Sequence, residues 1–319
     1  MEKEKIFVAV ICGPTASGKT ELGIRIARKS GGEIVSADSM QIYKGMEIAS
    51  AKPTEEEMGG IPHHMINFLP PNRTYSVADY VKDASRCISM IRERGKLPVI
   101  VGGTGLYISS LVNNLKFDDT GSDLNFREEM KHFAEKKGNT ALWEKLREVD
   151  PKTAFKLHPN NLNRIIRALE VYHISGITIS EAQEKSRSEG SPYRPFFMMP
   201  DYPREILYER IDNRVDKMLE AGLLKEAEEF FTHDDYVTSA QAIGYKELKP
   251  FFDGKKSLEE CVDKLKQATR NYAKRQLTWF GRESRLNRIP AGNGIGDDVV
   301  SEISEELSKQ QTDSEFGRL

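Results

Sequence analysis

The chain is constrained most by one octet, Gly13-Pro14-Thr15-Ala16-Ser17-Gly18-Lys19-Thr20. It matches the pattern G-x-x-x-x-G-K-[ST] at every fixed position. It follows residues 6–12, an apolar run that favours a strand, and it precedes residues 21–29, which favour a helix. Glycines let the backbone of such a loop approach phosphate closely, and the loop N–H groups and the positive helix end bind phosphate oxygens. The octet therefore predicts a binding site for a diphosphate or triphosphate.

The side chains of the octet complete this prediction. Lys19 adds a mobile positive charge, and the hydroxyl of Thr20 is suited to bind a magnesium ion that bridges phosphate oxygens. We therefore expect Mg²⁺ as the cofactor and Thr20 as its ligand. The residues predicted to bind the diphosphate are Gly13, Thr15, Ala16, Ser17, Gly18, Lys19 and Thr20.

Composition excludes several classes of protein. With 319 residues, 38% hydrophobic and 30% charged, the chain is typical of a large globular protein. No apolar run approaches the ~20 residues that span a bilayer, and the first residues do not resemble a signal peptide, so we expect a cytoplasmic protein with no membrane partner. The three cysteines lack metal-ligand spacing. Because the formal net charge is -2, a nucleic-acid partner would need a local basic surface.

The order of the predicted elements indicates an α/β fold. Residues 6–12, 33–37 and 97–101 read as strands, and the first and third lead through a glycine-rich loop into a helix. Residues 64–68 favour a further short strand, and a capping box at Ser76 and Asp79 opens a helix that ends near residue 94. Such alternation predicts a P-loop NTPase-like parallel sheet flanked by helices.

The character of the chain changes after residue 116. Residues 117–195 lack strand-like runs and contain helical patterns at 123–137, 140–149 and 161–174, so we expect an inserted all-helical domain. Residues 1–116 and 196–319 would form the catalytic core, with a strand at 196–199 and helices at 203–231 and 257–280. The polar, acidic tail predicts disorder over the last ten residues.

The usual ligand of a P-loop is a nucleotide, as in kinases and NTPases. Nucleotide-hydrolysing P-loop proteins hold magnesium with an aspartate at the end of an apolar strand, whereas here the strand at 97–101 ends in two glycines. Asp38 instead follows the strand at 33–37, where open α/β sheets place their ligands. This placement favours transfer of a group from a diphosphate or triphosphate donor to an acceptor near Asp38.

A segment near the C-terminus carries positive charge. Between Lys264 and Arg288 there are eight basic residues and a single acid, Glu283, with aromatic residues interleaved. A basic stripe with aromatics on a helix is typical of nucleic-acid binding, but a solvated helix with a buried aromatic face has the same composition. The composition alone leaves both interpretations open.

Several motifs in collinear order resemble the tRNA dimethylallyltransferases, which prenylate an adenine beside the anticodon. Besides the P-loop octet, they are DSMQIY at 38–43, IPHH at 61–64, YSVAD at 75–79, GGTGLY at 102–107, NRIIRALE at 163–170, QAIGYK at 241–246 and TRNYAKRQLTWF at 269–280. Two departures are visible. Asn67 stands where the family has an acid, and Gly281 stands where an arginine usually follows the Trp-Phe pair.

The resemblance implies a donor, an acceptor and a set of catalytic residues. The donor would be dimethylallyl diphosphate, and the acceptor the exocyclic N6 amine of the adenosine on the 3′ side of the anticodon. Asp38 would take the proton of the amine. The alternative roles for Asp38 are a helix N-cap and a magnesium ligand. Thr104 would contact the donor and the tRNA, with an N-cap role as the alternative. Arg210 would act on the diphosphate with Arg214 beside it, the alternative being surface ion pairs with neighbouring acids.

The family also implies an RNA surface, because the adenine must be flipped out to reach such a pocket. Asp38 and Gln41 are the residues expected to read its edge. The predicted tRNA contacts are Asp38, Ser39, Met40, Gln41, Thr104, Asn163, Arg164, Arg167, Gln241, Gly244, Lys246, Arg270, Lys274 and Arg275. The rival functions are an adenylate isopentenyltransferase, a small-molecule P-loop kinase and a non-catalytic RNA-binding protein. Nothing in the sequence requires more than a monomer.

Overall fold

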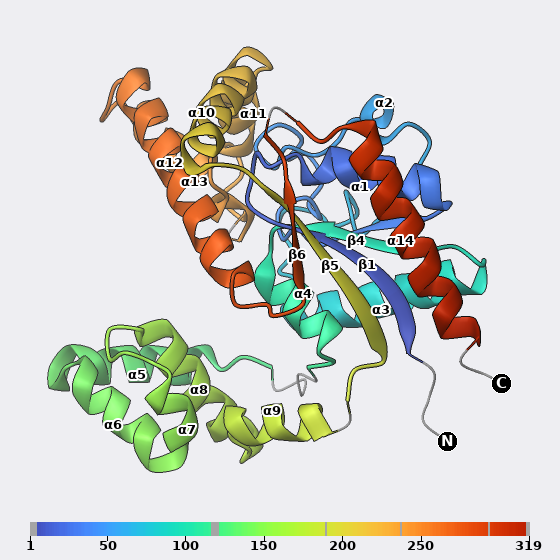
Figure 1. Ribbon diagram of the computed structural model, residues 1–319. Coiled ribbons are helices and arrows are strands. Elements are labelled where there is room, and N and C mark those ends of the chain that lie inside the picture. The colour runs from blue at the N-terminus through green and yellow to red at the C-terminus, as the bar shows by residue number, and fades with distance from the viewer. Residues whose placement is uncertain (1–4, 116–120, 189, 237, 293, 317–319) are drawn as a thin grey trace. The chain divides into compact units, whose positions relative to one another are not determined.

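The computed structural model describes residues 5–115, 121–188, 190–236, 238–292 and 294–316. The chain divides into two compact units, residues 1–112 with 192–319, and residues 113–191. We call the first the core unit and the second the helical unit (Figure 1). The domain boundary predicted after residue 116 lies outside the described residues.

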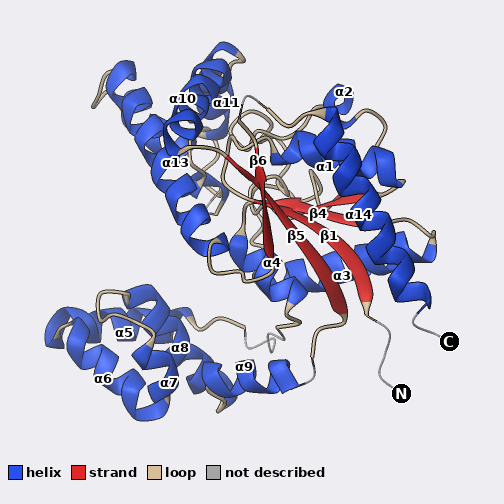
Figure 2. Cartoon of the chain, in the orientation of Figure 1, coloured by secondary structure: helices blue, strands red, loops and turns tan. Residues whose placement is uncertain are grey.

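The core unit contains a six-stranded sheet in the order β3-β2-β4-β1-β5-β6, and all of its pairs are parallel. Figure 2 shows it as red arrows between blue helices. Its strands are β1 (Ile6–Cys12), β2 (Glu33–Ser36), β3 (His63–His64), β4 (Pro98–Gly102), β5 (Tyr193–Asp201) and β6 (Leu286–Pro290). The predicted α/β class with a parallel sheet is therefore confirmed.

Helices cover both faces of this sheet, which explains why its central strands are continuously apolar. On one face, Val8 and Val10 of β1 pack with α3 (Val77–Glu93) and α4 (Gly105–Val112). On the other face, Ala9 and Ile11 pack with α1 (Lys19–Ser30) and α14 (Asp297–Phe316). Successive side chains of a strand point to opposite faces of the sheet, so each central strand contributes to two separate hydrophobic layers.

A third hydrophobic cluster of the core unit joins four helices to the segment after β2. The helices are α10 (Arg204–Glu220), α11 (Leu223–Phe230), α12 (Tyr245–Phe252) and α13 (Leu258–Phe280). Buried Ile42, Tyr43 and Met46 pack with buried residues of these helices, such as Phe230 and Tyr245. Two short elements, α2 (Glu55–Met58) and η1 (Ser239–Gln241), lie in the connections.

The helical unit has a hydrophobic core of its own. Its helices are α5 (Leu124–Lys137), α6 (Asn139–Val149), α7 (Pro151–Phe155), α8 (Leu162–Ser175) and α9 (Ile179–Ser188). Leu142, Leu146 and Ile165 are fully buried in its centre. Glu170 of α8 is also fully buried, and it accepts hydrogen bonds from Arg127 and Arg167. No strand occurs among the described residues of this unit.

Two expectations about the C-terminal part were wrong. The last ten residues were expected to be disordered, but α14 includes residues 310–316, and Val300 and Leu307, seven positions apart, hold this helix against the sheet. Residues 317–319 lie outside the described residues. The predicted single helix at 203–231 is broken between α10 and α11, where Gly222 has a φ of 101°. Glycine tolerates this left-handed conformation at little cost.

Strand positions also differ from the expectation. The strand predicted at 196–199 begins at Tyr193, because residues 193–195 pair with Ile6, Phe7 and Val8 of β1. Pro195 is tolerated because β6 pairs only with Phe197 to Asp201, which leaves this part of β5 at an edge. Where a strand was predicted at 64–68, the structure has the two-residue strand β3, which contains His63 and His64. Strand β6 was not predicted, although its residue Arg288 was counted in the basic stripe.

Candidate active site

The P-loop joins β1 to α1, as the octet predicts. Gly13 and Gly18 adopt φ angles of 143° and 75°, which side chains rarely allow. A Cβ atom on Gly13 would also lie 3.0 Å from Cγ of Met199 on β5. In this structure Lys19 Nζ donates to the carbonyl of Pro14 at 3.1 Å. The loop is therefore folded as a phosphate cradle, with its lysine against its own backbone.

Lys19 is affected by a second cation, Arg214, and by the Asp38 carboxylate. Burial, and then the neighbouring Arg214, lower the pKa of its ammonium group to about 8, although Asp38 opposes this shift. Burial also lowers the pKa of Arg214 below its usual value. Asp38 offsets this pair of neighbouring cations only in part, so the arrangement favours the binding of an anion.

Arg210 supports the P-loop from α10. Its Nε donates to the carbonyl of Ala16 at 2.9 Å, and its guanidinium lies 4.7 Å from the centre of the Tyr202 ring. Asp212, one of the acids considered as its partner in a surface ion pair, pairs instead with Arg270 of α13. Arg210 is therefore held against the loop that would carry the diphosphate.

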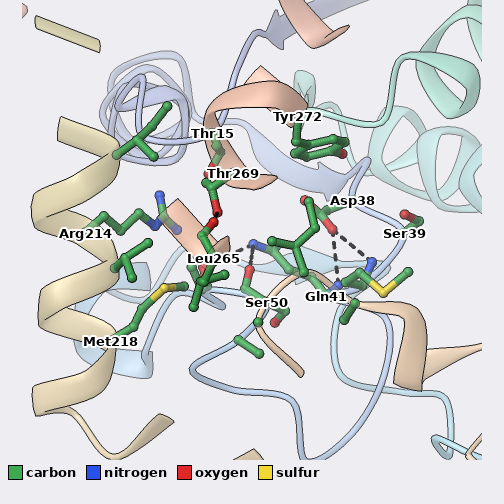
Figure 3. Close-up of a pocket in the computed structure, with 18 of the residues that line it drawn as sticks. Thr15, Asp38, Ser39, Gln41, Ser50, Arg214, Met218, Leu265, Thr269 and Tyr272 are labelled. Carbon is green, nitrogen blue, oxygen red and sulfur yellow. Dashed lines mark hydrogen bonds between the residues drawn. The ribbon is translucent and has the colours of Figure 1, made fainter. Parts of the chain in front are cut away.

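One cavity of about 310 Å³ brings many of the predicted residues together (Figure 3). In Figure 3, Asp38 and Gln41 line one side, and Arg214 and Met218 of α10 line the other. The predicted residues that line it are Thr15, Lys19, Thr20, Asp38, Ser39, Met40, Gln41, Arg214, Gln241, Gly244 and Arg275. Apolar side chains also line it, among them Ile211, Val215, Met218, Leu223 and Leu265. Cationic, acidic and apolar groups thus share a single cavity.

Asp38 begins the turn that follows β2. Its Oδ1 accepts hydrogen bonds from the N–H of Met40 at 2.9 Å and the N–H of Gln41 at 3.4 Å. The next helix begins only at Glu55, so Asp38 caps a turn and not a helix. The structure thereby fixes the carboxylate at the wall of the cavity.

Gln41 is occupied within the protein. Its Oε1 accepts from Ser36, and its Nε2 donates to the carbonyls of Ser50 and Ala51. In this structure Gln41 therefore holds residues 50–51 at the cavity wall. Its expected contact with the edge of an adenine stays a prediction and requires these bonds to exchange.

Thr104 lies beside the cavity wall and organises it. Its Oγ1 accepts from the N–H of Ser39 at 3.0 Å, and its own N–H donates to the carbonyl of Ala37 at 3.1 Å. Thr104 directly precedes α4, and it ties the end of β4 to the turn that carries Asp38. A direct contact with substrate stays a prediction.

Other predicted residues lie outside this cavity. Ala16, Gly18 and Arg210 line a second, wider depression, which shares Lys19 and Arg214 with the first. Gly13 and Ser17 are buried within the P-loop. Lys246, Arg270 and Lys274 line neither cavity, and Asn163, Arg164 and Arg167 belong to the helical unit.

The expected basic stripe is only partly available to a partner. Helix α13 ends at Phe280, so the stripe does not continue along one helix to residue 288. Four of its cations pair with acids, namely Lys266 with Asp216, Arg270 with Asp212, Arg285 with Glu283 and Arg288 with Asp201. Lys264, Lys274 and Arg275 are exposed cations of α13, and Lys264 donates to Gln267.

Three residues that shape the cavity or the second depression were missed in the sequence. Glu226 of α11 accepts from the N–H groups of residues 47, 48 and 49, and so fixes a wall segment. Buried Lys52 donates to the carbonyl of Tyr43 and to Asn67, the residue that replaces the acid of the family. Buried Gln276 bonds to the P-loop. No local pattern identifies them, because most of these contacts span long separations.

The oxygen donors near the P-loop fit a magnesium ion. Thr20 and Asp38 line a small cavity of about 20 Å³, together with Ser36 at the end of β2 and with Lys19 of the P-loop. Hydroxyl and carboxylate oxygens are the ligands that this cation prefers.

Among the described residues, none of the helices combines the length and the apolar character needed to cross a membrane.

Comparison with known proteins decides the family. The model of the IPP transferase family matches residues 41–283, and that of the isopentenyl transferases matches residues 6–68. The chain belongs to the IPP transferase family. The resemblance inferred from the motifs is thereby confirmed.

Curated members of this family are similar over most of the chain. A tRNA dimethylallyltransferase of Caldanaerobacter subterraneus subsp. tengcongensis is 52% identical over 279 residues, which cover 86% of this chain and 89% of that protein. One from Oceanobacillus iheyensis is 43% identical over 305 residues, covering 95% and 97%.

Solved structures of the family share the fold. The full-length tRNA isopentenylpyrophosphate transferase of Bacillus halodurans aligns with a TM-score of 0.73 at 40% identity, covering 98% of both chains. A eukaryotic dimethylallyltransferase acting on tRNA aligns with a TM-score of 0.78 at 29% identity, covering 95% of this chain and 77% of that one. The P-loop-type core with inserted helices is thus the fold of the family.

Proposed function

We propose that this protein is a tRNA dimethylallyltransferase. It transfers the dimethylallyl group from dimethylallyl diphosphate to the N6 amine of the adenosine 3′-adjacent to the anticodon, and it releases diphosphate. Membership of the IPP transferase family supports this proposal. The observation that carries it is the shared cavity, in which Lys19 and Arg214 lie near Asp38 and near apolar side chains.

The cations would act on the leaving group. The bond between the allylic carbon and the diphosphate oxygen breaks with its electron pair on oxygen, so negative charge grows on the diphosphate. Lys19, Arg210 and Arg214 stabilise that charge, and so do the N–H groups of the P-loop. Thr20 would hold a magnesium ion, which supplies further positive charge to the diphosphate when bound.

The apolar part of the cavity would hold the five-carbon group. Val215, Met218 and Leu265 offer no hydrogen bonds to a nucleoside, but they suit a branched hydrocarbon. They also exclude water, which would otherwise capture an allylic cation. A kinase site has no need of such side chains next to the diphosphate cradle.

Asp38 would act on the acceptor. The N6 amine is a weak nucleophile because its lone pair is shared with the purine ring, so loss of its proton must accompany the new N–C bond. The proton passes to the Asp38 carboxylate, whose Oδ1 is fixed by two backbone N–H groups. Such general-base assistance contributes about 10²- to 10⁴-fold.

Each unit offers side chains for the phosphates of the tRNA. Asn163 and Arg164 are exposed on α8 of the helical unit, and Lys274 and Arg275 are exposed on α13 of the core unit. Arg275 also lines the cavity, where it can contact the nucleotides that flank the target base. Binding through such contacts depends strongly on salt.

Transfer of a labelled group tests the proposal. The protein is incubated with Mg²⁺, labelled dimethylallyl diphosphate and either an anticodon stem-loop RNA or AMP. We expect label on the stem-loop, and none on a matched stem-loop with guanosine at the target position. Label on AMP alone would instead indicate an adenylate isopentenyltransferase, and ATP consumption without prenyl transfer would indicate a kinase.

A further inference from the structure

Gln276 of α13 connects two loops that lie far apart in the sequence. Its side chain is buried, with 4% of its surface exposed. Oε1 accepts from the N–H of Thr15 in the P-loop at 2.9 Å, and Nε2 donates to the carbonyl of Gly103 after β4 at 2.9 Å. These partners are 261 and 173 positions away. The amide thus spans from the diphosphate cradle to the β4–α4 turn.

The β4–α4 turn is built to receive α13. A Cβ atom on Gly103 would lie 2.2 Å from Nε2 of Gln276, and one on Gly105 would lie 2.3 Å from Cδ1 of Trp279. Gln276 and Trp279 are three positions apart, so they share one face of α13. The two glycines therefore allow an approach that any other residue would block.

The amide of Gln276 also determines which groups of the P-loop remain for a ligand. Since the N–H of Thr15 is bonded to Gln276, it points toward α13, and the following N–H groups are left for phosphate oxygens. The second partner, Gly103, precedes Thr104, which holds the N–H of Ser39 beside Asp38. One buried amide thus lies between the cradle and the segment that carries Asp38.

We propose that Gln276 is a positioning residue, which fixes the P-loop in the conformation that binds the diphosphate of the donor. This inference rests on the proposed function, because the diphosphate is the leaving group of that reaction. Gln276 acts through Thr15 and Gly103 and does not take part in the chemistry. Its removal should weaken the binding of diphosphate more than the binding of tRNA.

Gln276→Met tests this proposal, because methionine has a similar length but makes neither hydrogen bond. When a buried hydrogen bond is lost and its partner is left unsatisfied, a binding constant that depends on it falls by about tenfold or more. We expect the KM for dimethylallyl diphosphate and the Kd for inorganic diphosphate with Mg²⁺ to rise about tenfold. The KM for the stem-loop should stay within about twofold.

Gln267→Met is the matched control. Gln267 lies on the same helix, but its side chain is exposed and, among the described residues, accepts a hydrogen bond from Lys264 alone. We expect its diphosphate affinity and both KM values to match those of the unchanged protein. Unchanged diphosphate binding in Gln276→Met, or equal losses for both substrates, would overturn the proposal.

Gln276→Asn provides a second test if the methionine variant folds poorly. Asparagine keeps the amide but is one methylene too short to reach both partners. The proposal expects the same selective loss of diphosphate affinity, with a melting temperature close to that of the unchanged protein. Full diphosphate affinity in Gln276→Asn would contradict it. Because inorganic diphosphate is the probe, this outcome is independent of whether prenyl transfer is detected.

Discussion

The two units of this protein differ in how far apart in the sequence their interacting residues lie. In the core unit, the cavity is built from residues that lie far apart in the chain, such as Thr15, Asp38, Arg214 and Gln276. In the helical unit, the core and the buried Glu170 are held by contacts within about fifty positions. The first arrangement positions chemical groups with precision, and the second presents an exposed helix face.

This contrast leads to a general expectation. Substitutions at the cavity should change turnover or the binding of diphosphate, whereas substitutions on the helical unit should change tRNA affinity or local stability.

The largest effect is expected for Asp38→Ala. Without the carboxylate the amine keeps its proton during attack, so kcat should fall by about 10²- to 10⁴-fold. Affinity for the stem-loop should change much less, because Asp38 contributes only one of many RNA contacts. Single-turnover kinetics and stem-loop binding measure the two quantities. Comparable losses in both would show that Asp38 is a binding residue.

Lys19 should couple diphosphate binding to pH. Its pKa of about 8 means that the free protein loses this charge as the pH rises above 8, so binding then requires uptake of a proton. Titration calorimetry with diphosphate and Mg²⁺ should show affinity falling from pH 7 to pH 9. Lys19→Met should bind about 10²-fold more weakly at pH 7 and depend less on pH. An equally steep pH dependence in Lys19→Met would exclude Lys19 as the titrating group.

Glu170 should control the stability of the helical unit. Burial raises its pKa, but hydrogen bonds from Arg127 and Arg167 outweigh burial and leave the pKa below the usual 4.5. Its stabilising contribution is therefore present at neutral pH and is lost as the pH falls below about 4.5. Glu170→Gln should destabilise this unit by about 1–3 kcal/mol at pH 7.

Urea unfolding followed by Trp143 fluorescence, in a Trp279→Phe background, measures this effect within the helical unit. The exposed Glu128, which pairs with Lys131, supplies the control substitution Glu128→Gln, for which little change is expected. A Glu170→Gln difference that persists undiminished at pH 3 would show that its charge is not responsible.

The smallest effect is expected for Arg164→Ala on α8. Loss of one phosphate contact should weaken stem-loop binding several-fold and lower the salt slope by about one. The kcat at saturating RNA should not change. Lys131→Ala removes an exposed charge from the same unit and should leave affinity unchanged. Equal losses of stem-loop affinity in both variants would mean that Arg164 of α8 makes no specific contact with the RNA.

Local features of the fold could be predicted from the sequence. The P-loop, the buried strands and the capping box at Ser76 and Asp79 depend on neighbouring residues, and the structure has them where they were expected. Strand β6 was missed because its five residues include Asn287 and Arg288 and lie at the sheet edge. Helix α14 was missed because its acidic composition was weighed above the spacing of Val300 and Leu307.

Long-range features of the site could not be predicted. Nothing near Gln276 indicates that its amide reaches Thr15 and Gly103, because burial of a polar side chain depends on what folds over it. The same holds for Glu226, whose partners at residues 47–49 are at least 177 positions away. Arg214 was found only through the family resemblance, and its burial beside Lys19 became visible only in the structure.

A structure with an unreactive analogue of dimethylallyl diphosphate and an anticodon stem-loop tests the central claim most directly. We expect the diphosphate oxygens on the P-loop N–H groups and Lys19, and the N6 amine within about 3.2 Å of a carboxylate oxygen of Asp38. A diphosphate bound away from the P-loop, or Asp38 facing away from an extruded adenine, would contradict the account.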